Sequence, residues 1–108
     1  MLKEKTVVEL KEMMDKESDF QLIDVREPHE YEIANIGGEL IPMGEIIYEE
    51  ERIATDKPVV IHCRSGKRSA HVILQLQSMY ALDNLYNLKG GILAWSDEID
   101  PSVAKYDN

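Results

Sequence analysis

The sequence predicts an α/β fold in which helices cover both faces of a parallel β-sheet. Short apolar runs, such as Val59-Val60-Ile61, alternate along the chain with segments in which apolar residues recur every three or four positions. This alternation is typical of parallel strands joined by crossover helices. The chain has 108 residues and contains no internal repeat or low-complexity segment. We therefore expect one domain over residues 1–100, followed by a polar tail over residues 101–108.

The first helix is predicted to begin after Thr6 and to end near Lys16. Thr6 and Glu9 have the spacing of a capping box, in which each side chain accepts a hydrogen bond from the backbone N–H of the other residue. Apolar residues then recur on one face of this helix, at Val7, Leu10 and Met14.

A buried strand is predicted over residues 20–25, with Asp24 near its carboxyl end. A second helix is expected to begin at Arg26, because Pro28 is tolerated in the first turn of a helix. Arg26 and Glu30 are four positions apart, which is a separation at which helical side chains meet. We expect these two residues to form a structural ion pair.

The middle of the chain is predicted to contain a brief strand over residues 40–42, after the break at Gly37-Gly38. A helix is expected from Gly44 to about Ile53. Its inward-facing residues are predicted to be Ile46, Ile47 and Ile53. The three consecutive glutamates at 49–51 are interpreted as a solvated face.

The second half of the chain holds the predicted central strand, Val59 to His62. A helix is expected to follow, with its apolar face extending to about Tyr80, and residues 85–88 form the last predicted strand. The double glycine at 90–91 precedes a helical segment whose Trp95 is interpreted as a core residue. From Pro101 onward the chain is polar and is expected to fray.

Cys63, the only cysteine, ends the predicted central strand and begins a basic loop that runs to Ser69. In a strand–loop–helix unit, backbone N–H groups converge on one point and the helix N-terminus adds partial positive charge. Such surroundings favour the thiolate, which is the nucleophilic form of cysteine. Arg64, Lys67 and Arg68 are three of the twelve basic residues. We interpret them as a local binding site for a small anion rather than as a merely solvated loop.

The composition excludes several classes of function. A formal net charge of −9 argues against nucleic acid and anionic membranes as partners. A single cysteine excludes an internal disulfide, a Cys-x-x-Cys redox pair, a cysteine-rich zinc site and a second, resolving thiol. The N-terminal residues lack the apolar core of a signal peptide, and no apolar run is long enough to span a membrane. We expect a cytoplasmic protein without a cofactor.

Three motifs, in this order, resemble the rhodanese (sulfurtransferase) family. They are Asp24-Val25-Arg26 with Glu30-Tyr31, the loop from Cys63 to Ser69, and Lys89-Gly90-Gly91 with Ala94-Trp95. The resemblance covers about residues 5–98 and implies a five-stranded parallel sheet flanked by helices. It also implies that Cys63 accepts a sulfur atom as a persulfide (Cys–S–SH) and passes it on. The implied substrate-binding cradle consists of Arg64, Ser65, Gly66, Lys67, Arg68 and Ser69.

One stretch departs from the pattern of that family. Family members commonly carry Gly-His-Ile-x-Gly-Ala after the second helix, whereas residues 34–39 read Ala-Asn-Ile-Gly-Gly-Glu and place Asn35 at the histidine position. In this respect the chain resembles the rhodanese domains fused to enzymes that activate sulfur-carrier proteins. The partners implied are a small anionic sulfur donor and, as acceptor, a thiol or a sulfur-carrier protein.

The predicted chemistry is nucleophilic sulfur transfer. A Cys63 thiolate attacks the outer sulfur of a donor such as thiosulfate, and an anion such as sulfite leaves. Because donor and leaving group are both negative, Arg64, Lys67 and Arg68 would assist docking and departure, with Arg68 in the leading role since it closes the loop. Gly66 lets the loop turn and leaves its amides unshielded. With no second cysteine, an external thiol or cyanide must take the sulfur.

Two other functions remain open at this point. Tyrosine phosphatases also combine His-Cys with a basic glycine loop, but they need Cys-x5-Arg to enclose phosphate, and the chain from Cys63 to Arg68 reads Cys-x4-Arg. The smaller ring suits one sulfur atom, although Asp24 or Asp56 could serve as a general acid. The second alternative is a sulfur-relay or protein-binding module with little turnover.

The histidines are interpreted as structural. Neighbouring strand residues point to opposite faces, so His62 need not touch Cys63, and we expect a buried histidine that satisfies its own hydrogen bonds rather than a general base. His29 and His71 are expected at the surface. Because the three histidines are scattered, no metal site is predicted.

Overall fold

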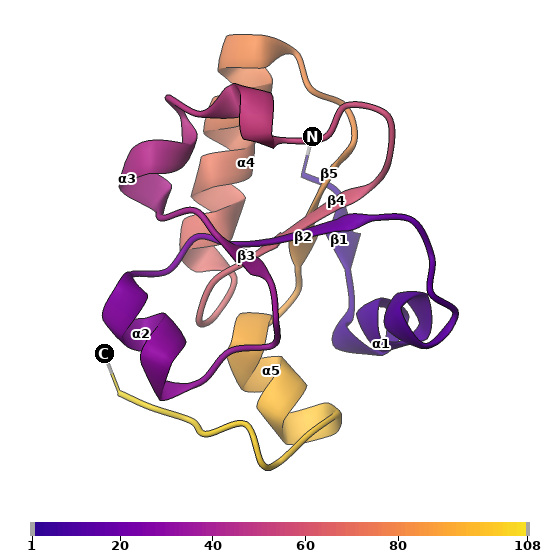
Figure 1. Ribbon diagram of the computed structural model, residues 1–108, viewed down its shortest axis with the longest axis vertical. Coiled ribbons are helices and arrows are strands. Elements are labelled where there is room, and N and C mark those ends of the chain that lie inside the picture. Colours follow the sequence, from indigo (N-terminus) through magenta and orange to yellow (C-terminus); the bar gives the residue numbers. More distant parts are fainter. Residues whose placement is uncertain (1, 108) are drawn as a thin grey trace.

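The computed structural model describes residues 2–107 and contains one five-stranded parallel sheet, as predicted (Figure 1). The strands are β1 (Glu4–Lys5), β2 (Gln21–Asp24), β3 (Glu39–Leu40), β4 (Val59–His62) and β5 (Leu85–Leu88). They lie in the order β1-β5-β4-β2-β3, and every neighbouring pair is parallel. Residues 1 and 108, the outer ends of the expected domain and tail, lie outside the described residues.

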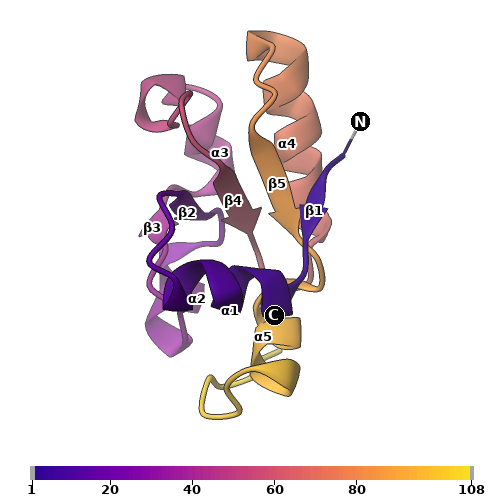
Figure 2. The same cartoon turned by 90° about the vertical axis from the view of Figure 1, so that its right-hand side faces the viewer.

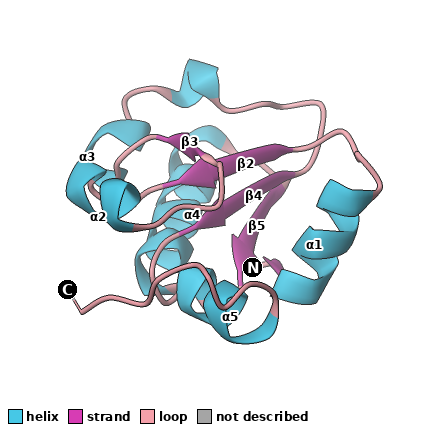
Figure 3. Ribbon diagram, turned by 60° about the horizontal axis from the view of Figure 1, so that its bottom comes forward, coloured by secondary structure: helices cyan, strands magenta, loops and turns pink. Residues whose placement is uncertain are grey.

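In the described residues, four α-helices and one short 3-10 helix connect the strands, and a fifth α-helix follows β5. They are α1 (Val7–Asp15), α2 (Pro28–Ile33), α3 (Met43–Ile46), the 3-10 helix η1 (Glu50–Arg52), α4 (Lys67–Tyr80) and α5 (Gly91–Glu98). Figure 3 shows α1 and α5 on one side of the sheet with α4 behind it, and Figure 2 shows α4 running alongside β5.

The two faces of the sheet bury separate apolar clusters, because successive strand residues point to opposite sides. Val59 and Ile61 of β4 pack on one side, and Val60 between them packs on the other. The first cluster also contains side chains of α3 and α4, among them Ile46, Val72, Ile73 and Leu76. The second contains side chains of α1 and α5, namely Val7, Leu10 and Trp95. The core positions of Leu10 and Trp95 are therefore as predicted.

The N-terminal part of the chain contains one predicted and one unpredicted feature. The capping box of α1 is present: the Glu9 N–H donates to Thr6 Oγ1 at 3.1 Å, and the Thr6 N–H donates to Glu9 Oε1 at 2.8 Å. Strand β1 was not predicted. It has only two residues, both charged, and becomes a strand by pairing with β5, where Lys5 aligns with Leu88.

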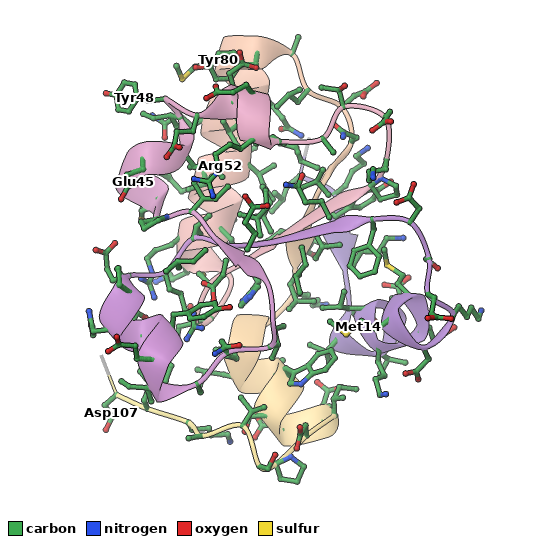
Figure 4. The ribbon with its side chains drawn as sticks, viewed as in Figure 1. Met14, Glu45, Tyr48, Arg52, Tyr80 and Asp107 are labelled. Carbon is green, nitrogen blue, oxygen red and sulfur yellow. The ribbon has the colours of Figure 1, made fainter. Side chains whose placement is uncertain are left out.

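The helix expected over residues 44–53 is wrong as a single element. It is divided into α3 and η1, and α2 likewise begins at Pro28 rather than at Arg26. The Tyr80 hydroxyl donates to the Ile47 carbonyl at 2.5 Å, so α4 contacts the chain just after the end of α3. Ile46 and Ile53 are nevertheless buried as expected. Figure 4 shows Tyr48 projecting away from this segment, while Tyr80 comes from the end of α4.

Gly91 illustrates how closely α5 packs against the loop after β4. Its φ is +59°, and an added Cβ would lie 2.5 Å from the Arg64 carbonyl oxygen and 2.6 Å from that of Cys63. The same two carbonyls accept hydrogen bonds from the N–H groups of Ile92 (3.0 Å) and Leu93 (3.1 Å). The N-terminus of α5 is therefore fixed to the backbone of the cysteine loop.

We expect Gly91→Ala to lower the free energy of unfolding by at least about 2 kcal/mol, because backbone atoms block the new methyl group and the left-handed conformation disfavours alanine. Urea denaturation measures this change. Gly44→Ala in α3 is the matched control, since a Cβ there meets nothing within 4 Å. It should change stability by less than about 1 kcal/mol, in the stabilising direction. Equal effects of the two substitutions would contradict the tight packing at Gly91.

Candidate active site

The sulfur of Cys63 lies at the carboxyl end of β4, where the chain turns into α4. Cys63 Sγ accepts hydrogen bonds from the Gly66 N–H at 3.1 Å and the Ser69 N–H at 3.4 Å, and it lies 3.4 Å from Ser69 Oγ. Gly66 has a φ of +99°, a left-handed conformation that turns its amide towards the sulfur. Two backbone N–H dipoles aimed at one sulfur stabilise negative charge on it.

Asn87 of β5 holds the other side of this loop. Its Nδ2 donates to the Gly66 carbonyl at 3.1 Å, and its Oδ1 accepts from the Ser69 hydroxyl at 2.5 Å. Ser69 has one hydroxyl proton, and the shorter contact assigns it to Asn87, which leaves oxygen lone pairs facing the sulfur of Cys63. Asn87 was not singled out from the sequence, although a buried amide inside a short strand is a signal that could have identified it.

The predicted site residues share this one loop, but their side chains have different surroundings. Cys63, Gly66 and Ser69 are buried, and Cys63 is only 1% exposed. Ser65 and Lys67 are exposed, whereas Arg64 and Arg68 are half-buried. The loop backbone therefore surrounds the sulfur, while the basic side chains extend to other parts of the molecule.

Arg68 binds Glu30 of α2 through two parallel hydrogen bonds. Arg68 Nη1 and Nη2 donate to Glu30 Oε1 and Oε2, each at 2.7 Å. This contact lowers the pKa of the Glu30 carboxyl to about 2, against the opposing effect of its burial, with a further contribution from Tyr106. The same contact raises the pKa of Arg68, which burial opposes and the Cys63 sulfur supports. Both groups are therefore charged.

The predicted ion pair between Arg26 and the Glu30 carboxylate is wrong. Arg26 lies before α2 and turns back onto Asp24: Arg26 Nε donates to Asp24 Oδ1 at 2.9 Å, and Nη2 donates to Oδ2 at 2.7 Å. Both side chains are fully buried. Arg26 reaches only the backbone carbonyl of Glu30, at 3.3 Å, because the carboxylate is engaged by Arg68. The spacing of Arg26 and Glu30 in the sequence could not show that Arg26 pairs with Asp24 and Glu30 pairs with Arg68.

The C-terminal segment lies against the site instead of fraying as expected. In Figure 1 it returns from the end of α5 towards α2, and Figure 4 labels Asp107 near α2. The Arg64 Nε donates to the Tyr106 carbonyl at 2.8 Å. The Tyr106 hydroxyl lies 2.6 Å from Glu30 Oε2 and 3.0 Å from Arg26 Nη1. Beside this segment is an open pocket of about 410 Å³, lined by Arg64, Leu93, Asp97, Lys105, Tyr106 and Asp107.

His62 is buried as expected, but it does not satisfy all of its own hydrogen bonds. Its Nδ1 lies 3.3 Å from the Cys63 carbonyl, which can only accept, so Nδ1 carries a proton. Its Nε2 has no hydrogen-bond partner among the described residues and lies 3.6 Å from Asp24 Oδ2. Burial lowers the pKa of His62, and Asp24 only partly opposes this. The ring is therefore neutral at neutral pH.

Within residues 2–107, none of the helices has the length and apolar character needed to cross a membrane. Within the same range, no three His, Cys, Asp or Glu side chains are grouped as ligands of a metal ion.

Comparisons with known proteins point to one family. A family model described as "Rhodanese-like domain" matches residues 6–98. The chain is 36% identical over 101 residues to "Putative sulfurtransferase YtwF" of Bacillus subtilis, covering 93% of this chain and 96% of that protein. The crystal structure of a rhodanese-like domain protein from Staphylococcus aureus superposes with a TM-score of 0.80 at 29% identity, covering 98% of this chain and 100% of that one.

Other relatives are longer than this chain. It is 34% identical over 101 residues to "Probable adenylyltransferase/sulfurtransferase MoeZ" of Mycobacterium tuberculosis, which covers 91% of this chain but 26% of that protein. The chain also spans less than two thirds of the length of several other curated relatives.

The lowered pKa of Glu30 predicts an acid-sensitive contribution to stability. A carboxyl whose pKa is lower in the folded than in the unfolded protein stabilises the fold above its ordinary value of 4.5 and loses that effect as pH falls towards 2. From about pH 5.5 to about pH 3, wild type should lose about 2 kcal/mol more stability than Glu30→Gln. Urea denaturation at a series of pH values measures the difference.

Glu50→Gln on η1, which removes an exposed carboxylate, is the control for this experiment. It should follow the wild-type pH dependence. Parallel curves for wild type and Glu30→Gln would show that the contact with Arg68 does not lower the pKa of Glu30.

Proposed function

Because the chain belongs to the rhodanese-like domain family, we propose that it is a sulfurtransferase in which Cys63 carries the transferred sulfur as a persulfide. The predicted resemblance to this family is confirmed by the family match over residues 6–98 and by relatives named sulfurtransferase, including one of nearly the same length. The observation that carries the proposal is the pair of N–H groups, from Gly66 and Ser69, aimed at the sulfur of Cys63.

The proposed reaction has two displacement steps. The Cys63 thiolate attacks the outer sulfur of thiosulfate, so that a new S–S bond forms as the S–S bond of the donor breaks and sulfite leaves with its electron pair. An acceptor thiolate then attacks the outer sulfur of the Cys63 persulfide and takes it away. The Cys63 thiolate is regenerated, and neither step needs an external oxidant or reductant. The N–H groups of Gly66 and Ser69 face the negative charge of the attacking thiolate in the first step and the charge that returns to the Cys63 sulfur in the second.

The basic side chains contribute unequally to this proposal. Lys67 is exposed at the first position of α4 and can approach an anionic donor directly. Arg68 is bound to Glu30, so its charge is partly compensated, and Arg64 is engaged by Tyr106. The expected leading role of Arg68 in docking is therefore shared with Lys67.

For the acceptor, we propose a thiol or a sulfur-carrier protein. The support is the similarity to MoeZ, whose name combines adenylyltransferase with sulfurtransferase. A relay module is the second candidate function, because Cys63 is only 1% exposed and an acceptor must dock closely to reach it. A relay should accept sulfur from a donor and then turn over slowly with small acceptors such as cyanide, whereas an enzyme should turn over steadily.

Treatment with thiosulfate should raise the intact mass of the protein by one sulfur atom, and a reducing thiol should reverse the change. Mass spectrometry of the whole chain makes this measurement. Cys63→Ser should gain nothing, because a hydroxyl at this position cannot form a persulfide. Sulfur loading of Cys63→Ser, or no loading of wild type by either thiosulfate or a small-molecule persulfide, would refute the proposal.

Arg68→Ala should lower kcat/KM for thiosulfate by about tenfold through loss of positive charge beside the sulfur. It should also destabilise the fold, since it leaves the buried Glu30 carboxylate without its partner. The double variant Arg68→Ala/Glu30→Gln is the matched control, because it should restore stability but not activity. Recovery of activity with stability would show that Arg68 is purely structural.

A further inference from the structure

Tyr106 contacts three charged residues around the site, namely Glu30, Arg26 and Arg64. Its hydroxyl reaches Glu30 Oε2 at 2.6 Å and Arg26 Nη1 at 3.0 Å, and its carbonyl accepts from Arg64 Nε at 2.8 Å. Its ring lies against the guanidinium groups of Arg64 and Arg26, with the carbon Cζ of each at 5.4 and 5.8 Å from the ring centre.

The direction of the hydroxyl proton follows from its two partners. A guanidinium group can only donate, so the Tyr106 oxygen accepts from Arg26. Its proton must then point to the Glu30 carboxylate, which can only accept. Burial and this contact raise the pKa of Tyr106, with Arg26 opposing, so the phenol keeps the proton that the geometry requires. The hydroxyl therefore links the Asp24–Arg26 pair to the Glu30–Arg68 pair.

The Glu30 carboxylate is fixed from every side. Its Oε1 accepts from Arg68 Nη1 and from the Glu27 N–H, at 2.7 and 3.1 Å, and its Oε2 accepts from Arg68 Nη2 and Tyr106. Among the described residues, Tyr106 supplies the one contact that comes from outside α4 and outside α2 with its N-cap Glu27. Without it, the bidentate Glu30–Arg68 unit can swing together towards the solvent, because Arg68 is half-buried rather than enclosed.

We propose that Tyr106 is a positioning residue for sulfur transfer, which fixes Glu30 and thereby holds the Arg68 guanidinium in one place next to the loop that surrounds Cys63. This role rests on the proposed function, since it assigns to the C-terminal segment part of the site that docks the anionic donor. It differs from a lid: a lid controls access for every reagent equally, whereas a residue that places a positive charge controls access according to the charge of the reagent.

The experiment compares Tyr106→Phe with wild type by two measurements. Tyr106→Phe keeps the ring and its packing and removes only the hydroxyl. The first measurement is the ratio of the alkylation rates of Cys63 by iodoacetate and by uncharged iodoacetamide, which reports the charge near the sulfur. The second is kcat and KM with thiosulfate. Tyr48→Phe is the matched control, because Tyr48 is 77% exposed and remote from these contacts.

Tyr106→Phe should lower the iodoacetate-to-iodoacetamide ratio about fivefold and raise KM for thiosulfate by about tenfold, the size expected for one lost hydrogen bond to a charged group, with kcat nearly unchanged. Tyr48→Phe should leave both quantities at wild-type values. In an Arg68→Ala background, Tyr106→Phe should not change the ratio further, because the charge that it positions is already absent.

Two results would overturn the inference. One is an unchanged ratio in Tyr106→Phe, which indicates a lid instead if both reagents react faster by the same factor. A second drop of the same size in the Arg68→Ala background would show that Tyr106 acts independently of Arg68. The alkylation ratio does not depend on sulfur transfer, so it still decides the role of Tyr106 if wild type fails to accept sulfur from any donor.

Discussion

The burial of two carboxylates, those of Asp24 and Glu30, is the constraint on which this structure depends. Asp24 and Glu30 are 0% and 1% exposed, and an isolated carboxylate in such surroundings would be destabilising by several kcal/mol. Each is therefore matched by an arginine with two or more hydrogen bonds, Arg26 for Asp24 and Arg68 for Glu30. These pairs join β2, α2 and α4, so the position of α4 beside the sulfur is set by electrostatics as well as by apolar packing.

The cysteine loop meets a second constraint, which is steric. Two glycines, Gly66 and Gly91, meet this constraint. Gly66 turns through a left-handed conformation, and Gly91 lets two carbonyl oxygens approach where a Cβ would collide with both. Asn87 then fixes the peptide of Gly66 from β5. The loop is thus shaped by contacts from three elements rather than by its own sequence alone.

The sequence was sufficient for the features that depend on local pattern. The β-branched run of β4, the capping box at Thr6 and the strand–loop–helix order around Cys63 are local, and each predicted its structure correctly. Strand β1 exists only because β5 is beside it, and no pattern within two charged residues encodes that partner. The contacts of Glu30 lie 38 positions away in Arg68 and 76 positions away in Tyr106, so periodicity could not find them.

The charge balance of the two ion pairs of the buried carboxylates explains why backbone dipoles are important for stabilising negative charge on the sulfur. Asp24, Arg26, Glu30 and Arg68 together carry no net charge, and the chain as a whole is acidic, with a formal charge of −9. These four side chains therefore add no net positive charge next to the cysteine loop. Amide N–H groups provide a fixed positive potential that does not titrate, and a nearby guanidinium held in one orientation adds to it without strong repulsion from the surrounding carboxylates. Under the proposed function, this site would gain and lose a charged sulfur without rearranging its ion pairs.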